Sequence, residues 1–321
     1  MTIDRRDMLR GAACAAVAAS LPAPAAVAQG AASGAKVFLD YTQEELDRAY
    51  DQTVWAPNQD ELIQRYATRS AATRQRRKFM AGIAYGPTED EVLDIFPAAK
   101  VPAPIHVFVH GGAWRGGSKD IYSFPADIFV PAGATYVAVN FANIPKQRLP
   151  DMAAQIRRAI AWLYGNAASF GGDRERIYVS GHSSGGHLAA VLLTTDWLAL
   201  GLPRDIIKGG VCASGLYDMH PAMLSSRRNY VTLSSEEEAA LSPLAHLDIV
   251  SCPIAVAHGT RESPEFQRQA RAFVAALASG GYRHEFAVLD GLNHFEVCDS
   301  LANPHSPLSQ MALRQMGLSA A

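Results

Sequence analysis

The chain has 321 residues, of which 49% are hydrophobic and 19% charged, and its formal net charge is −2. This composition suits one large globular domain with a sizeable core and is unlike that of a disordered chain. It lacks the basic surplus that nucleic-acid binding requires and the acidic tail that a cationic partner would favour.

The first 28 residues have the pattern of a twin-arginine signal peptide. Arg5 and Arg6 precede a small apolar run over 11–21, and an A-x-A cleavage site ends at Ala28. Pro22 closes the apolar run too early for a membrane-spanning helix. We therefore expect export to the periplasm, cleavage after Ala28 and no stable membrane association of the mature protein.

Residues 29–40 have the composition of a short linker, and a single domain is expected over 41–321. Two helices are predicted at its start, near 43–51 and 59–76. Each would begin with a capping box, formed by Thr42 with Glu45 and by Asn58 with Glu61.

Short apolar runs then alternate with helical patterns, as expected for a doubly wound, mostly parallel sheet in an α/β fold. Two antiparallel edge strands are expected first, over 80–85 and 91–96. The predicted parallel strands follow at 105–109, 134–141, 177–180, 209–213, 253–257 and 285–289. The long connection over 216–247 is expected to form a small cap over the carboxyl ends of the strands, where ligands bind in such sheets.

The run from Gly181 to Gly185 matches the G-x-S-x-G pattern of a nucleophile elbow, with Ser183 as the nucleophile. Alone, the pattern also fits an ordinary glycine-rich turn. Its context favours the elbow, because it follows a predicted strand and opens a helical pattern. The two glycines would keep side chains out of the space where strand and helix nearly touch.

A second glycine-rich turn, His110-Gly111-Gly112-Ala113-Trp114, follows the predicted strand 105–109. It is typical of the loop that supplies an oxyanion hole, since glycines let backbone N–H groups approach a substrate carbonyl. The expected donors are the N–H groups of Gly112, Ala113 and Ser184.

The order of a Ser, acid, His triad predicts the base after the last strand, where His294 lies. The acid should follow the strand 253–257. Glu262 is favoured there because Glu265 would already lie in the next helix, and Asp290 and Asp248 are weaker candidates. The carboxylate would hold the imidazole in the correct tautomer.

Three further residues are candidates for the substrate pocket: Trp114, Tyr217 and His182. Trp114 fits a core position equally well, and Tyr217 could simply anchor the cap. No metal or cofactor is expected, because the histidines and cysteines form neither H-E-x-x-H nor C-x-x-C.

Together these residues resemble the kynurenine formamidase-like (arylformamidase) family of the α/β-hydrolase fold, over roughly 41–318. The marks of the resemblance are His110-Gly111-Gly112-x-Trp114, Gly181-His182-Ser183-Ser184-Gly185-Gly186-His187, Glu262-Ser263-Pro264-Glu265-Phe266 and Asn293-His294-Phe295. The family hydrolyses N-formylkynurenine to formate and kynurenine without a metal. By this resemblance, Ser183, Glu262 and His294 would form the triad. The family usually has aspartate as the acid, and its pathway is normally cytoplasmic.

The sequence therefore predicts a serine hydrolase that cleaves a small ester or aryl formamide through an acyl-enzyme. A general periplasmic carboxylesterase with the same triad is the alternative, and a non-catalytic binding protein is a remote one. The natural substrate and the oligomeric state are left open, a homodimer being one of the states that the sequence allows.

Overall fold

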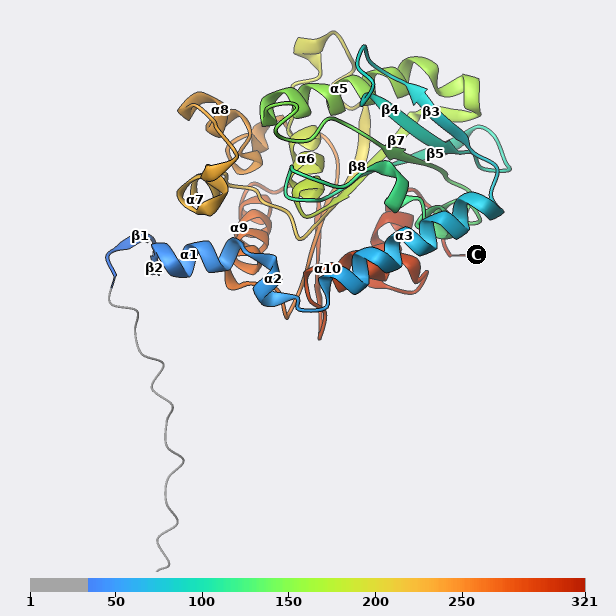
Figure 1. Cartoon of the computed structure of the whole chain (residues 1–321). Coiled ribbons are helices and arrows are strands. Elements are labelled where there is room, and N and C mark those ends of the chain that lie inside the picture. Colours follow the sequence, from blue (N-terminus) through green and yellow to red (C-terminus); the bar gives the residue numbers. More distant parts are fainter. Residues whose placement is uncertain (1–33, 321) are drawn as a thin grey trace, which may run out of the picture. The chain divides into compact units, whose positions relative to one another are not determined.

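The computed structural model describes residues 34–320, shown in Figure 1. The predicted signal peptide and the first part of the predicted linker lie outside the described residues. The end of that linker is not free of structure, as β1 (Lys36–Phe38) pairs antiparallel with β2 (Tyr41–Thr42).

A central sheet of eight strands carries the fold. Its strands are β3 (Met80–Ala84), β4 (Val92–Phe96), β5 (Ala103–Val109), β6 (Thr135–Val139), β7 (Gly172–His182), β8 (Ile207–Ala213), β9 (Ile254–Gly259) and β10 (His284–Leu289). They lie in the order β10-β9-β8-β7-β5-β6-β4-β3. The strands from β10 to β6 are parallel, and β4 and β3 extend this edge antiparallel. The predicted mostly parallel sheet with an antiparallel edge pair is confirmed.

Helices connect and cover the strands. They are α1 (Gln43–Tyr50), α2 (Gln52–Trp55), α3 (Gln59–Arg76), α4 (Ala126–Phe129), α5 (Leu149–Asn166), α6 (Ser184–Leu193), α7 (His220–Leu224), α8 (Ser235–Ala240), α9 (Pro264–Ser279), α10 (His294–Asp299) and α11 (Pro307–Gln315). Within residues 34–320, no helix is both long enough and apolar enough to cross a membrane.

The two predicted capping boxes have different outcomes. Thr42 and Glu45 form theirs at the start of α1. Asn58 makes no cap on α3, because its amide is engaged elsewhere. It accepts from the Asn293 amide at 2.7 Å and donates to Glu296 at 3.2 Å. Asn58 thereby ties the start of α3 to the start of α10.

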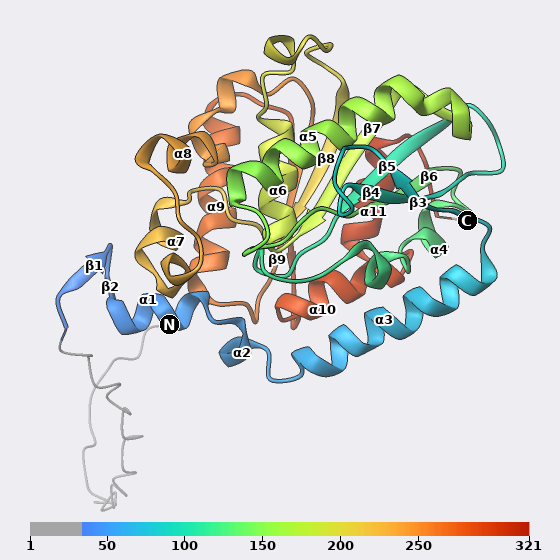
Figure 2. The same cartoon turned by 45° about the horizontal axis from the view of Figure 1, so that its top comes forward.

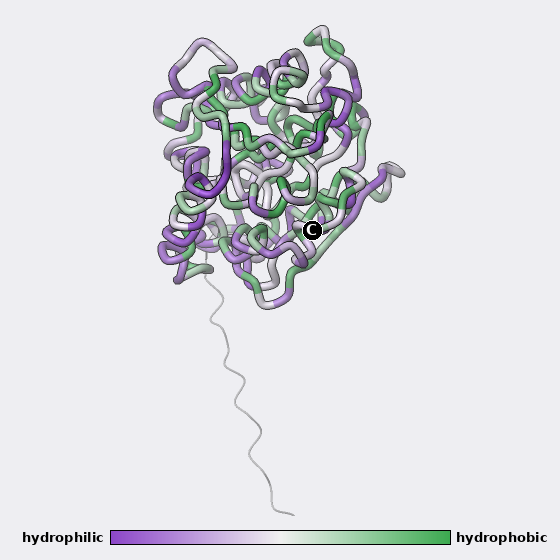
Figure 3. Tube along the Cα trace, turned by 90° about the vertical axis from the view of Figure 1, so that its right-hand side faces the viewer, coloured by the Kyte–Doolittle hydropathy of each residue, from purple (hydrophilic) through white to green (hydrophobic). Residues whose placement is uncertain are grey.

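The core has two halves, one on each face of the sheet. Alternate residues of a strand point to opposite faces, so Val107 and Val109 pack in one half while Phe108 packs in the other. Residues of α5, α6 and α9 complete the first half, and residues of α3, α4 and α11 complete the second. Figure 2 shows these helix layers on either side of the sheet, and Figure 3 shows the hydrophobic stretches gathered inside.

The predicted cap, 216–247, is a helical insertion after β8 that contains α7, the 3₁₀ turn η4 (Ser226–Asn229) and α8. It leaves the sheet at the carboxyl end of β8, beside the carboxyl end of β7, its parallel neighbour. The elements that carry Ser183, the acid loop and α10 all begin at this same end, so the topology gathers the predicted site residues.

Candidate active site

Ser183 forms a sharp turn between β7 and α6. Its backbone has φ 59° and ψ −127°, a conformation that residues other than glycine rarely adopt and that marks a nucleophile elbow. Crowding explains the flanking glycines. A Cβ on Gly181 would lie 2.1 Å from the carbonyl oxygen of Gly185, and one on Gly185 would lie 2.1 Å from that of Val109. An ordinary glycine-rich turn would not require this strain at a serine.

The predicted oxyanion loop follows β5 and approaches the elbow. The backbone of Gly112, Ala113 and Trp114 has positive φ at all three residues, 126°, 55° and 60°. The Trp114 N–H donates to the hydroxyl of Ser184 at 3.2 Å, which ties the loop to the start of α6. Among residues 34–320, no acceptor pairs with the N–H groups of Gly112, Ala113 or Ser184. Unpaired, closely held N–H groups beside the serine are what an oxyanion hole requires.

Glu262 and His294, the predicted acid and base, are hydrogen-bonded to each other. The His294 Nδ1–H donates to Glu262 Oε2 at 2.8 Å, and the other carboxylate oxygen accepts from Ser214 Oγ and Gly259 N, both at 2.6 Å. Because the carboxylate fixes the proton on Nδ1, Nε2 of His294 is left as the basic nitrogen.

The charge state of Glu262 follows from its surroundings. The side chain is fully buried, and burial alone would raise the pKa of the carboxyl. The hydrogen bonds from His294, Gly259 and Ser214 outweigh burial and hold the pKa below its usual range. Glu262 is therefore ionised at neutral pH, as an acid that stabilises a developing imidazolium must be.

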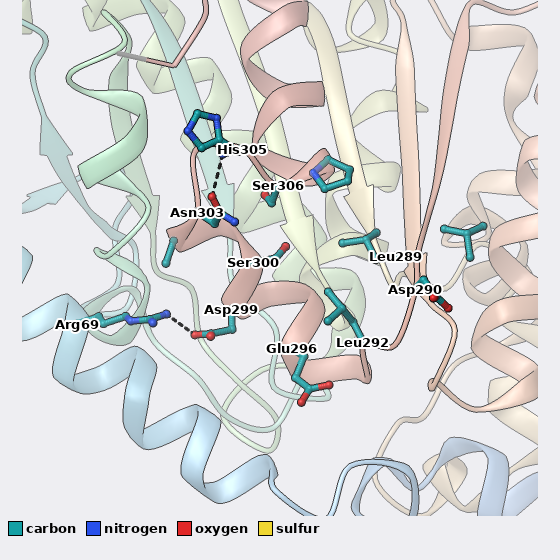
Figure 4. Close-up of a pocket in the computed structure, with 13 residues that line it drawn as sticks. Arg69, Leu289, Asp290, Leu292, Glu296, Asp299, Ser300, Asn303, His305 and Ser306 are labelled. Atoms are coloured by element: carbon teal, nitrogen blue, oxygen red, sulfur yellow. Dashed lines mark hydrogen bonds and ion pairs between the residues drawn. The ribbon is translucent and has the colours of Figure 1, made fainter.

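The other candidate acids are engaged elsewhere. Glu265 binds Arg268 through two hydrogen bonds of 2.7 Å and accepts from Tyr50 at 3.2 Å. Asp290 lines a separate cavity of about 570 Å³, drawn in Figure 4. Asp248 lies on the 3₁₀ turn Leu247–Ile249, outside the cleft that contains Ser183. Of the four candidate carboxylates, Glu262 is therefore the one that is hydrogen-bonded to His294.

His182, a predicted pocket residue, holds the base in place. Its Nε2–H donates to the backbone carbonyl of His294 at 2.7 Å. Burial, reinforced by the neighbouring His294, lowers the pKa of His182 to about 3, so the ring is a neutral donor at physiological pH. His182 also lines the cleft, together with Ser183 and His294.

The predictions that Trp114 and Tyr217 line the pocket are wrong. Trp114 is 1% exposed and donates its indole N–H to His187 Nδ1 at 3.3 Å, below the loop that it supports. Tyr217 is equally buried, stacks on Phe273 with ring centroids 4.2 Å apart, and donates to the Cys212 carbonyl. Both aromatic rings support the site from the core side and do not face the cleft.

The cleft above Ser183 measures about 830 Å³ and has a wall that the sequence did not reveal. Besides the oxyanion loop and His294, it is lined by the N-terminal segment from α1 to α3 and by four residues of the cap, Ser226, Arg227, Asn229 and Tyr230. Tyr50 and Gln52 come from the first of these walls and Arg227 from the second. The carbonyl of Tyr50 accepts from Arg227 at 3.1 Å across 177 positions of sequence, a contact that no local pattern signals.

Within residues 34–320, no group of three His, Cys, Asp or Glu side chains is arranged to hold a metal ion. Cys212, Cys252 and Cys298 are all free and buried. Among them, burial raises the pKa of Cys252 to about 12, so this thiol stays protonated.

Comparison with known proteins places these features in context. The sequence model named BD-FAE matches residues 93–198, and that of the carboxylesterase family matches residues 153–244. Kynurenine formamidase of Danio rerio is 31% identical over 291 residues, 87% of this chain and 98% of that protein. Kynurenine formamidase of Salmo salar is 30% identical over 297 residues, which cover 88% of this chain and 99% of that protein. A crystal structure from Silicibacter sp. superposes with a TM-score of 0.74 at 26% identity, over 84% of this chain and 98% of that one.

Proposed function

Because this chain belongs to the kynurenine formamidase-like family of α/β-hydrolase serine hydrolases, we propose that it cleaves aryl formamides through a formyl-enzyme on Ser183. One observation carries the proposal: the strained Ser183 lies in one cleft with His294, whose Nδ1–H is fixed by the ionised Glu262. Relatives of nearly full length that hydrolyse a formamide support the choice of bond.

The reaction follows from the proton positions. His294 Nε2 takes the proton of the Ser183 hydroxyl as its oxygen attacks the formyl carbon. The resulting oxyanion accepts from the N–H groups of Gly112, Ala113 and Ser184. Each such donor typically supplies about 2.7–4 kcal/mol of transition-state stabilisation. The imidazolium is stabilised by Glu262 while it forms.

Collapse of the tetrahedral intermediate completes the first half. The C–N bond breaks, and His294 gives its proton to the leaving aryl amine. Water then enters, loses a proton to His294 and attacks the formyl-Ser183 ester. The second collapse releases formate and returns the proton to the serine oxygen. An aryl amine is weakly basic and therefore a better leaving group than an alkyl amine, which favours formanilide-type substrates.

A general carboxylesterase is the second candidate function. It is favoured by the match of the carboxylesterase sequence model to residues 153–244, and it would use the same triad. The two candidates differ in the bond that the cleft prefers, because an ester needs less protonation of its leaving group than an amide.

The cellular setting belongs to the proposal as well. The Arg5-Arg6 pair and the A-x-A site ending at Ala28 favour export of a folded enzyme to the periplasm. There it would act on small molecules, without stable membrane association, as a monomer or a homodimer. Fractionation of cells expressing the full chain and its Arg5→Lys, Arg6→Lys variant tests this. Periplasmic activity that survives the double substitution would contradict the twin-arginine route.

The test of the function compares kcat/KM of purified residues 29–321 for N-formylkynurenine and for p-nitrophenyl acetate. Ser183→Ala serves as the blank. Formamide turnover at least comparable with ester turnover supports the arylformamidase. Turnover of the ester without turnover of the formamide would instead support the general carboxylesterase.

A further inference from the structure

Arg227 is a buried cation in the catalytic cleft. It is 6% exposed, lines the cleft with Ser183, and forms no ion pair with any carboxylate in the described part of the chain. Burying an unpaired charge is expensive, so a buried arginine is normally paired with an anion. No such anion from the described part of the chain lies beside Arg227.

The guanidinium is held firmly by neutral groups only. Its Nη1 donates to Tyr230 Oη at 2.6 Å and its Nη2 to the Tyr50 carbonyl at 3.1 Å. Its Cζ lies 5.4 Å from the ring centroid of Trp114 and 5.7 Å from that of Tyr50. These contacts fix its position without neutralising its charge, and its Nε is buried without an acceptor.

Gln52 adds a second unpartnered group in the same cleft. It is 9% exposed, and both its Nε2 and its Oε1 lack a hydrogen-bond partner within residues 34–320. It stands two residues after Tyr50, whose carbonyl binds Arg227, so the two side chains come from adjoining parts of the cleft wall. Buried amides are otherwise hydrogen-bonded.

We propose that Arg227 and Gln52 form a subsite for a carboxylate of the substrate, so that the enzyme acts on acidic formamides or esters. The carboxylate would accept from Arg227 Nε and from the Gln52 amide and would neutralise the buried charge. This inference rests on the proposed hydrolase function, since it places the subsite in the cleft of Ser183. A planar guanidinium suits a carboxylate better than a lysine ammonium would.

The other large cavity among residues 34–320 does not repeat this arrangement. In the separate cavity of Figure 4, Arg69 donates to Asp299 at 2.6 Å. The carboxylates that line the catalytic cleft are Glu44, Asp47 and Asp51, and none of them forms an ion pair with Arg227. Asp51 caps α2, and Asp47 accepts from Gln43. Arg227 is thus a cation kept free of protein anions inside a reaction cleft.

The experiment uses two substrate pairs that are matched except for one carboxylate. N-formylkynurenine and N-formylkynuramine differ in the leaving group. Mono-p-nitrophenyl succinate and p-nitrophenyl butyrate differ in the acyl group. The measured quantity is the ratio of kcat/KM for the acidic member to that for the neutral member. This ratio also decides on which side of the scissile bond the carboxylate binds.

In the wild type, we expect a ratio above one for at least one pair. Arg227→Gln should lower that ratio by roughly 10- to 100-fold, the usual worth of a hydrogen bond to a charged group. Gln52→Leu should lower it less, and the variant should keep its fold, since the side-chain amide of Gln52 has no hydrogen bond to lose within residues 34–320. Arg228→Gln is the matched control, because Arg228 is the adjacent, exposed arginine outside the cleft.

Two results would overturn the subsite: wild-type ratios at or below one in both pairs, or an unchanged ratio in both Arg227→Gln and Gln52→Leu. If Arg227→Gln does not fold, Gln52→Leu and Arg227→Lys decide. Calorimetric binding of L-kynurenine against kynuramine to Ser183→Ala separates the two proposals. If the wild type turns over none of the substrates, the proposed function is wrong. If Ser183→Ala binds L-kynurenine and kynuramine with equal affinity, the proposed subsite is wrong.

Discussion

Replacing Glu262 by glutamine is expected to disable the base while leaving the fold in place. Glu262 Oε1 accepts from Gly259 N and Ser214 Oγ, and Oε2 accepts from His294 Nδ1. The backbone N–H of Gly259 can only donate, so the glutamine oxygen must take the first position. Its NH₂ group must then face His294.

The consequence is a change of tautomer. An amide NH₂ facing Nδ1 requires an unprotonated Nδ1, so the proton moves to Nε2 and His294 can no longer accept the proton of Ser183. A change of this kind lowers kcat by about 10⁴-fold in a serine protease. That loss corresponds to roughly 5.4 kcal/mol of transition-state stabilisation. A loss of this order is the prediction here.

The assay is kcat/KM for p-nitrophenyl acetate, together with the thermal midpoint of unfolding. Glu265→Gln is the matched control, since Glu265 is also a buried glutamate but pairs with Arg268. It should lower stability more than it lowers catalysis. A Glu262→Gln variant that keeps more than about a tenth of the activity, or a Glu265→Gln variant that loses more activity than Glu262→Gln, would contradict the role of Glu262.

Further predictions concern the elbow, the oxyanion loop and the buried histidines. Gly185→Ala places a Cβ 2.1 Å from the Val109 carbonyl oxygen. The yield of soluble protein should therefore be low, and the free energy of unfolding should fall by several kcal/mol, of the order that overpacking costs. A denaturation midpoint close to that of the wild type would contradict this. Ser184→Ala removes the acceptor of the Trp114 N–H and should lower kcat about 10-fold with little change in KM, whereas a change in KM alone would argue against a role in the oxyanion loop. Burial lowers the pKa of His106 and His182 to about 3, from 6.5. The unfolded chain therefore binds more protons than the folded one between these values, and the free energy of unfolding should fall as pH drops from about 6.5 towards 3. Urea titrations at several pH values check this, and a flat profile over that range would refute it.

The fold was predictable because its signals are local. Buried parallel strands appear as short apolar runs, and the strand, turn and helix around Ser183 follow one another directly within 172–193. The triad was predictable for a related reason, since its order along the chain is a property of the fold. His294 could thus be placed after β10 and Glu262 after β9 without any knowledge of their contact.

The predictions that were wrong concern residues whose surroundings depend on contacts between distant parts of the chain. Asn58 resembles a helix cap, but its amide is taken by Asn293, 235 positions away. Trp114 adjoins the oxyanion loop, yet a strained backbone turns its ring towards His187 and the core. In the wall of the cleft, Tyr50 ends a helix that was predicted, whereas Gln52 begins α2, a short helix that was not, and neither could be placed over the site from the sequence. Contacts between distant parts of the chain bring this wall and the cap together, among them the hydrogen bonds of Arg227 with Tyr50 and of Gln43 with Leu224.

The most direct test of the account is covalent labelling by a fluorophosphonate, followed by peptide mass spectrometry of residues 29–321. We predict one labelled residue, Ser183, and no labelling of Ser183→Ala. We also predict that labelling of Glu262→Gln is slowed by about the same factor as its turnover. Labelling at another residue, or an unlabelled protein that still hydrolyses its substrate, would contradict Ser183 as the nucleophile.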